Sequence, residues 1–176
     1  MDFIKTWREV ILRPSDFYRR MPKTGGYANP LIFTVICLII NTLLSELFRP
    51  SMLKLIGLHN QRPSISIFTY IILIPIITIL GIFIIAFVFN VLYKAFGGTG
   101  NYEGTVRFIS YASAPIVFAW IPIFGSIFGI YGLYLYIVGG MIVHNVSMKK
   151  STILMLPFAL LTMYYGLRYI LSSFTH

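Results

Sequence analysis

Charged residues are scarce in this chain, and acidic residues are the scarcest of all. Of 176 residues only 5 are Asp or Glu and 14 are Lys or Arg, whereas 57% are apolar and the mean hydropathy is +0.82. A soluble domain of this length leaves roughly 30% of its unfolded-chain surface in water and needs polar residues to cover it. The composition therefore excludes an ordinary soluble domain and indicates an integral membrane protein.

Residues that carry covalent or metal chemistry are equally few. The single cysteine, Cys37, cannot form an intramolecular disulfide, and the histidines are scattered without the spacing of metal ligands. Gly97, Gly98 and Gly100 are not followed by the Lys-Ser/Thr pair of a phosphate-binding loop, and no Ser-His-Asp, paired-carboxylate or HExxH arrangement is visible. We therefore expect a non-enzymatic protein with no catalytic residue, no metal and no cofactor.

Long uncharged runs fill the space between the few charges, at residues 24–45, 63–93, 108–148 and 151–167. A helix needs about 20 apolar residues to cross a hydrocarbon core about 30 Å thick, so the third run is long enough for two crossings. The break between them is expected at residues 121–125, where proline and glycine favour a turn.

The predicted fold is thus an all-α integral membrane protein with five transmembrane helices in a membrane domain at 29–171. The second run is longer than one crossing needs, and we expect Pro75 to kink it. The expected spans are about 29–47, 65–95, 104–121, 125–146 and 151–171.

Lysine and arginine are divided unevenly between the two sides that five crossings define. The first side carries Lys5, Arg8, Arg13, Arg19, Arg20, Lys23, Lys94, Arg107, Lys149 and Lys150. The second side carries Arg49, Lys54, Arg62 and Arg168. This bias predicts a cytoplasmic amino terminus and a carboxyl terminus outside. Because the cations are dispersed along membrane boundaries, we expect no nucleic-acid partner.

The leader, residues 1–28, has an amphipathic pattern. Phe3, Trp7, Val10 and Ile11 recur at helical spacing, and cations occupy much of the rest. We expect a short interfacial helix that ends at Pro14, with its apolar face in the headgroup boundary and its cations toward anionic phospholipid headgroups. The expected interfacial anchors are Trp7, Arg8, Arg13, Phe17, Arg19 and Arg20.

A polar island, residues 97–107, separates the two longest uncharged runs. If a helix starts near Asn101, Glu103 and Arg107 are one turn apart and form an ion pair, with Tyr111 next on the same stripe. We expect either a salt bridge that fixes the depth of the third span or a site for a partner, headgroup or phosphate. The candidate polar cluster comprises Gly97, Gly98, Gly100, Tyr102, Glu103, Gly104, Arg107, Tyr111 and His144.

His144 is included because it would end the fourth span on the same membrane side. It is either an ordinary hydrogen-bonded ring or, if a partner is near, a pH-sensitive group.

Small residues gather in the fourth span. Gly125 and Gly129 form a GxxxG pair, and Gly132, Gly139 and Gly140 follow. Small side chains let membrane helices approach closely and gain van der Waals contact. We expect these glycines to pack the third and fourth spans into a tight helical hairpin.

Several motifs occur in an order that resembles a known family. Trp7 and Arg13-Pro14-Ser15-Asp16-Phe17 are followed by Gly97-Gly98-Thr99-Gly100-Asn101-Tyr102-Glu103-Gly104-Thr105-Val106-Arg107, then Tyr111-Ala112, Pro115, Ile121-Pro122-Ile123-Phe124-Gly125, Tyr131, and Gly139-Gly140 with His144 and Ser147. Over nearly the whole chain this resembles the Yip domain family (Ypt/Rab-interacting proteins), in a compact prokaryotic-type form.

The resemblance implies five spans with a cytosolic amino terminus, in the plasma membrane if the protein is prokaryotic. It also implies a role in membrane organisation or vesicle trafficking. Eukaryotic members of the family associate with Rab-type GTPases and with one another, and carry a substantial cytosolic amino-terminal region. The short leader of this chain weighs against a Rab-type GTPase as its partner.

Three functions remain open at this point. The first is a membrane scaffold or adaptor that binds protein partners or lipid on its cytosolic face, or that self-associates. The second is a small oligomeric transporter or channel. The third is a lipid-binding or lipid-handling protein that uses Arg107 and the cytosolic basic residues. Side chains that would line a transport route are Asn41, Asn90, Arg107, Tyr111 and His144.

Overall fold

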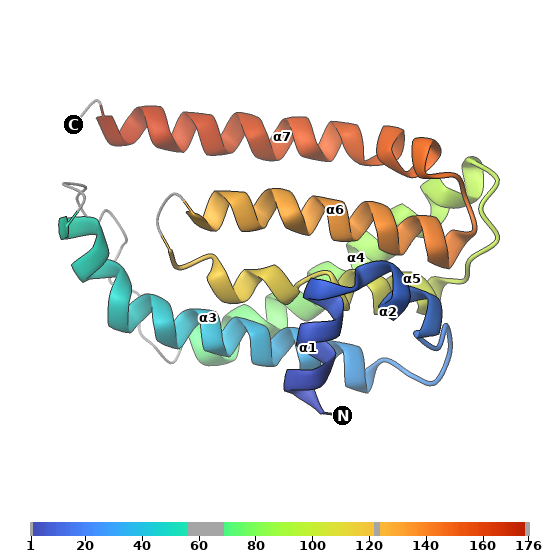
Figure 1. Ribbon diagram of the computed structural model, residues 1–176, viewed down its shortest axis with the longest axis horizontal. Helices are drawn as coiled ribbons and strands as arrows, with labels where there is room; N and C mark the ends of the chain where they lie inside the picture. The colour runs from blue at the N-terminus through green and yellow to red at the C-terminus, as the bar shows by residue number, and fades with distance from the viewer. Residues whose placement is uncertain (1, 56–68, 122–123, 175–176) are drawn as a thin grey trace.

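The computed structural model describes residues 2–55, 69–121 and 124–174, which are almost entirely helical (Figure 1). Four helices are long: α3 (Ala28–Leu55), α4 (Ile74–Ala95), α6 (Phe124–His144) and α7 (Met148–Phe174). Three are short: α1 (Phe3–Leu12), α2 (Pro14–Arg20) and α5 (Tyr102–Tyr111). A π-helical turn, η1 (Thr69–Leu73), precedes α4, and a 3-10 helix, η2 (Ala114–Phe118), follows α5.

Three helices are long and apolar enough to cross a membrane, within the residues the structure describes. They cover Ala28–Phe48, Ile74–Ala95 and Phe124–His144. Large apolar side chains lie exposed along these helices, among them Ile84 and Ile130. Because so much apolar surface is not stable in water, the helices support an integral membrane protein, and the count of five crossings stays a prediction.

The region predicted as the third span is not one continuous helix. α5 ends at Tyr111, the chain turns at Ala112 and Ser113, and η2 continues the path. Pro115 contributes to this break because it lacks an N–H group and disfavours the α conformation in the residue before it. The prediction of a single helix over residues 104–121 is therefore wrong.

The break is stabilised by side-chain hydrogen bonds. The carbonyl oxygen of Ser110 accepts from the Thr34 hydroxyl at 2.9 Å and from the Ser113 hydroxyl at 2.6 Å. Irregular backbone at membrane depth needs such partners when it is buried in protein.

The second span also differs at its start. Pro75 lies in the first turn of α4. Backbone N–H groups there have no acceptor within the helix, so proline, which lacks this group, is tolerated. The change from π-helical to α-helical structure occurs at this point.

Part of the turn predicted at 121–125, residues 122–123, lies outside the described residues.

The leader packs onto the bundle instead of lying apart from it. The Phe3 ring lies 5.3 Å from that of Phe33 on α3, and Val10 is fully buried. The indole N–H of Trp7 donates to the carbonyl of Ala114 at 3.0 Å. The apolar face predicted to enter the headgroup boundary thus lies against protein. The aromatic surface of the bundle offers this face closer packing than lipid does.

Two of the predicted packing glycines lie at close helix contacts. A Cβ atom on Gly139 would come within 2.9 Å of the Phe108 ring of α5, and one on Gly140 would overlap the Tyr93 ring of α4. Gly139 lets α6 approach α5, which is the contact expected for the hairpin, and Gly140 lets α6 approach α4, which was not predicted.

The GxxxG pair does not have this role within the chain. A Cβ atom on Gly125 would meet the Ala119 carbonyl, which belongs to the turn before α6, at 2.8 Å. Gly129 and Gly132 have no atom within 4 Å of such a Cβ among the described residues. For these three glycines the prediction of helix packing is not supported.

The glycine contacts give a first prediction. Gly140→Ala forces the added methyl group into the Tyr93 ring and is expected to destabilise the fold by about 1–3 kcal/mol. Gly129→Ala is the matched control, because it adds the same group in open space and improves helix propensity. Thermal unfolding in detergent measures both. Equal melting temperatures for the two variants would contradict the packing of α6 on α4.

Candidate functional site

The predicted polar cluster lies at one end of the bundle, where three connections meet. They are the linker at 21–27 between α2 and α3, the loop at 96–101 between α4 and α5, and the turn at 145–147 between α6 and α7, all on the right in Figure 1. We term this region the glycine-loop end. The Thr99 amide donates to the His144 carbonyl at 2.9 Å, and the Lys150 ammonium donates to the Phe96 carbonyl at 2.9 Å. These bonds join the loop to the turn.

Asn101 begins α5, as predicted. Its side-chain oxygen accepts from the amide of Gly104 at 2.8 Å, which satisfies one of the free donors of the first turn. A Cβ atom on Gly104 would lie 2.8 Å from this oxygen and 3.0 Å from Val143 of α6. Glycine at this position therefore lets the start of α5 lie against α6.

Glu103 and Arg107 bind the linker and not each other. The Gly26 amide donates to Glu103 Oε1 at 2.6 Å, and Arg107 Nη1 donates to the Gly26 carbonyl at 2.6 Å. Two side chains one turn apart on α5 thus bind the backbone N–H and C=O groups of Gly26. We term this arrangement the Gly26 clamp. The predicted ion pair between Glu103 and Arg107 is wrong: within the described residues the salt bridge is Arg20–Glu9, at 3.3 Å.

The backbone of the linker explains why the clamp forms. Gly25 and Gly26 have φ angles of 117° and 88°, values that glycine adopts without steric cost. Arg107 is only 5% exposed, so its charge needs a hydrogen-bond partner inside the protein. The Gly26 carbonyl, carried from 81 residues away in sequence, is that partner.

Tyr102 and Tyr111 bond or pack within the bundle. The Tyr102 hydroxyl donates to the Phe83 carbonyl of α4 at 2.9 Å. The Tyr111 ring packs at 5.0 Å from Phe17 of α2 and at 5.2 Å from Phe33 of α3. Tyr111 therefore contributes to the aromatic packing between α5, α2 and α3.

His144, the last residue of α6, contacts a different face of α5 from the one that forms the Gly26 clamp. Its ring stacks on Tyr93 with centroids 4.3 Å apart, and its Nε2 bonds the Thr105 hydroxyl at 2.8 Å. A Cβ atom on Gly100 would lie 2.7 Å from His144 Nδ1, and one on Gly98 would lie 2.7 Å from the Tyr93 carbonyl. The loop glycines therefore allow close packing over the imidazole.

Gly97 has a different reason to be glycine. Its φ angle is 83°, in the left-handed region, at the point where the chain leaves α4. The predicted cluster is thus divided between the clamp and the contacts around His144, while Tyr102 and Tyr111 contact other parts of the bundle.

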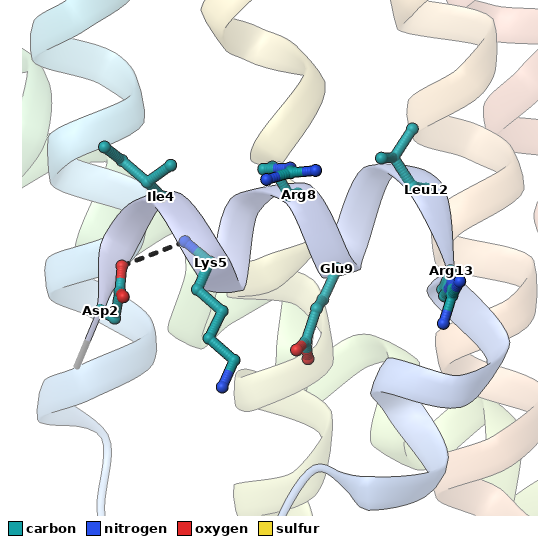
Figure 2. Close-up of a pocket in the computed structure, with 7 residues that line it drawn as sticks. All are labelled: Asp2, Ile4, Lys5, Arg8, Glu9, Leu12 and Arg13. Carbon is teal, nitrogen blue, oxygen red and sulfur yellow. Dashed lines mark hydrogen bonds between the residues drawn. The ribbon is translucent and has the colours of Figure 1, made fainter.

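The predicted membrane anchors also divide into two groups. Trp7 and Phe17 face protein, through their contacts with Ala114 and Tyr111. The basic anchors are exposed on the outer surface of the leader: Arg8, Arg13, Arg19 and Arg20. Figure 2 shows the outer face of α1, a shallow depression bordered by Asp2, Ile4, Lys5, Arg8, Glu9, Leu12 and Arg13.

Sequence reasoning missed the partners of the cluster. The Gly25-Gly26 pair before the first span was a usable signal, because adjacent glycines favour a special backbone conformation. The Tyr93 hydroxyl bonds Ser151 at 2.8 Å, and Ser151 donates to the Ile137 carbonyl at 2.8 Å. No local spacing indicates that bond, which joins residues 58 positions apart.

The chemistry of the site is that of a hydrogen-bonded framework. Within the described residues no three His, Cys, Asp or Glu side chains are placed to hold a metal ion. Buried side-chain atoms without a partner in the same residues are Asn41 Oδ1, Asn90 Oδ1, Arg107 Nε, Trp120 Nε1 and His144 Nδ1. The Gly26 clamp and the loop bonds hold backbone segments together, and the Thr105 hydroxyl bonds His144 Nε2.

The Gly26 clamp gives a second prediction. Arg107→Ala removes a charge-assisted hydrogen bond and is expected to lower the free energy of unfolding by about 1.5–3 kcal/mol. It should also speed trypsin cleavage after Lys23, because the linker loses one of its two hydrogen bonds to α5. Arg19→Ala is the control, since Arg19 is exposed on α2. Cleavage at Lys23 that is unchanged by Arg107→Ala would contradict the clamp.

The sequence model of the Yip1 domain matches residues 8–170 of this chain. No curated protein and no solved structure matches this chain. The matched range runs from α1 through most of α7, and it includes the Gly26 clamp and the loop over His144. The resemblance seen in the sequence is thereby confirmed, and the chain belongs to the Yip1 domain family.

Proposed function

We propose that this protein is a non-enzymatic membrane scaffold or adaptor that docks protein partners at the glycine-loop end, in membrane organisation or trafficking. The observation that carries the proposal is that the polar side chains of the cluster are engaged inside the protein. Glu103 and Arg107 bind Gly26, and His144 packs against Tyr93 and bonds Thr105. These contacts support structural roles for Glu103, Arg107 and His144. Function then falls to the charges left on the surface.

Those surface charges are mainly basic. Lys23 and Lys94 are exposed beside the loop, and Lys149 and Lys150 begin α7 next to it. The loop is tied to α6 and α7 by backbone and lysine hydrogen bonds, so the surface is preformed. A rigid basic surface favours a partner that presents an acidic segment, because charge complementarity speeds encounter and fixes register.

The topology that goes with this function has five crossings of a membrane domain at residues 29–171. The uneven distribution of lysine and arginine supports a cytosolic glycine-loop end and an outside carboxyl terminus. α3, α4, α5 with η2, α6 and α7 run alternately in opposite directions in Figure 1, which also supports it. In a prokaryote the membrane is the plasma membrane.

Reporter fusions test this topology. A phosphatase fused after His176 is expected to be active, and the same enzyme fused after Lys150 is expected to be inactive, because it folds only outside the cytoplasm. Inactive phosphatase at both positions would contradict five crossings.

Site-directed photocrosslinking in cells tests the docking role. A photoreactive residue at Lys149 or Lys23 is expected to give a discrete protein adduct. Lys149→Glu with Lys94→Glu should weaken the adduct formed from position 23, because these changes remove the basic surface. The matched control position is Ile84, an exposed apolar residue of α4. Failure to capture any protein at the first two positions, including a second copy of this chain, would contradict the proposal.

A small oligomeric transporter or channel is the second candidate. The observation in its favour is the pair of buried amide oxygens of Asn41 and Asn90, which have no partner among the described residues and would be satisfied by water or solute. Solute flux in reconstituted vesicles that Asn90→Leu abolishes would favour it. The placement of Tyr111 and His144 on separate faces of α5 gives no support to one route lined by both.

A further inference from the structure

The outer face of α1 carries both exposed apolar groups and unpaired cations. Ile4 and Leu12 are each 68% exposed, and Arg8 lies between them at the spacing of one helical turn. These three residues with Lys5 and Arg13 form what we term the outer ridge of α1. The opposite face of the helix is already occupied by its packing on α3 and η2.

The ridge has a direction along the bundle. In Figure 2, Ile4 and Leu12 lie along the edge of α1 farther from α2, and Lys5 and Glu9 point to the edge nearer α2. α2 and the start of α3 lie on the same side of α1, toward the glycine-loop end (Figure 1). Ile4 and Leu12 therefore point along the spans toward the membrane interior, Arg8 lies between them on the same edge, and Lys5 points away from it.

The depth of α1 suits the boundary of a bilayer. Phe3 packs on Phe33, which is the sixth residue of α3 and so lies about 8 Å along that helix from its start, at 1.5 Å per residue. An amphipathic helix in a membrane interface buries its apolar side about 5–10 Å into the headgroup and acyl boundary. α1 runs across the long helices in Figure 1, so it lies roughly in the plane of a membrane that those helices cross.

The charges of the ridge select an anionic ligand. Glu9 is paired with Arg20, and Asp2 accepts the Lys5 amide as the helix cap, so both acids near the ridge are engaged. The side chains of Lys5, Arg8 and Arg13 form no hydrogen bond or ion pair within the part of the chain that the structure describes. Free cations beside apolar groups match a phosphate with acyl chains beneath it.

We propose that the outer ridge of α1 binds the headgroups of anionic phospholipids in the host bilayer, with Ile4 and Leu12 inserted beside them. α1 is then held between the bundle on one face and lipid on the other. The face in lipid is the one opposite to the Phe3, Trp7 and Val10 face. This inference does not depend on the docking of protein partners, and it rests on the membrane placement proposed above.

Depth measurements in lipid vesicles test the insertion. Fluorescent labels on Ile4→Cys and Leu12→Cys are expected to be quenched by brominated lipid and protected from iodide. Native Cys37 is fully buried and can stay in place. The control is Asp16→Cys on exposed α2, which should respond in the opposite way. Labels on α1 that iodide quenches as strongly as the control would overturn the proposal. Protection from both quenchers would also overturn it, because a protein would then cover the ridge.

Lipid selectivity tests the charges. The full chain is placed in nanodiscs of phosphatidylcholine with phosphatidylglycerol, and the lipids that it retains after extraction are counted by native mass spectrometry. Arg8→Gln is expected to lower phosphatidylglycerol retention about fivefold, the effect of one cation at a membrane surface. Lys54→Gln makes the same change of charge at the far end of α3 and should leave retention unchanged. Equal retention by the two variants would overturn the headgroup site, even if scaffold partners are captured elsewhere.

Discussion

α5 is enclosed by protein from Gly104 to Tyr111 although it carries a guanidinium and several hydroxyl groups. A buried polar group without a partner costs about 1–3 kcal/mol, and a charge costs more, so other segments must supply partners. Gly26 accepts from Arg107, and Thr34 donates to the Ser110 carbonyl. Because these partners come from different parts of the chain, satisfying α5 also fixes where the linker and α3 lie.

The same constraint explains the form of the third span. A continuous helix over residues 104–121 would keep its own backbone bonds and need no help from α3. The actual path breaks at Ala112 and Ser113, and its freed carbonyl is met by Thr34 and Ser113. The short leader helices then pack over the broken segment, with Trp7 bonded to Ala114. The leader is therefore part of the framework of the bundle.

Hydropathy predicted a large part of this fold, and contacts between residues far apart in sequence could not be predicted. The apolar runs located the four long helices, although α3 extends past the predicted end at 47 and α4 begins well after the predicted start at 65. The polar island predicted the start of α5 near Asn101. The Glu103–Arg107 spacing satisfied the rule for an ion pair, yet both side chains found a better partner in Gly26, far away in sequence. Periodicity located the apolar face of α1 and could not tell whether lipid or protein covers it.

The Gly26 clamp joins the linker that follows the leader to α5, and amide hydrogen exchange at Gly26 tests that connection most directly. In the wild-type protein the Gly26 amide, bonded to Glu103, is expected to exchange slowly. Glu103→Ala should speed its exchange about tenfold to hundredfold, the equivalent of one hydrogen bond to a charged group. Asp16→Ala should leave it unchanged. Exchange at Gly26 that is as fast in the wild type as in Glu103→Ala would contradict the account.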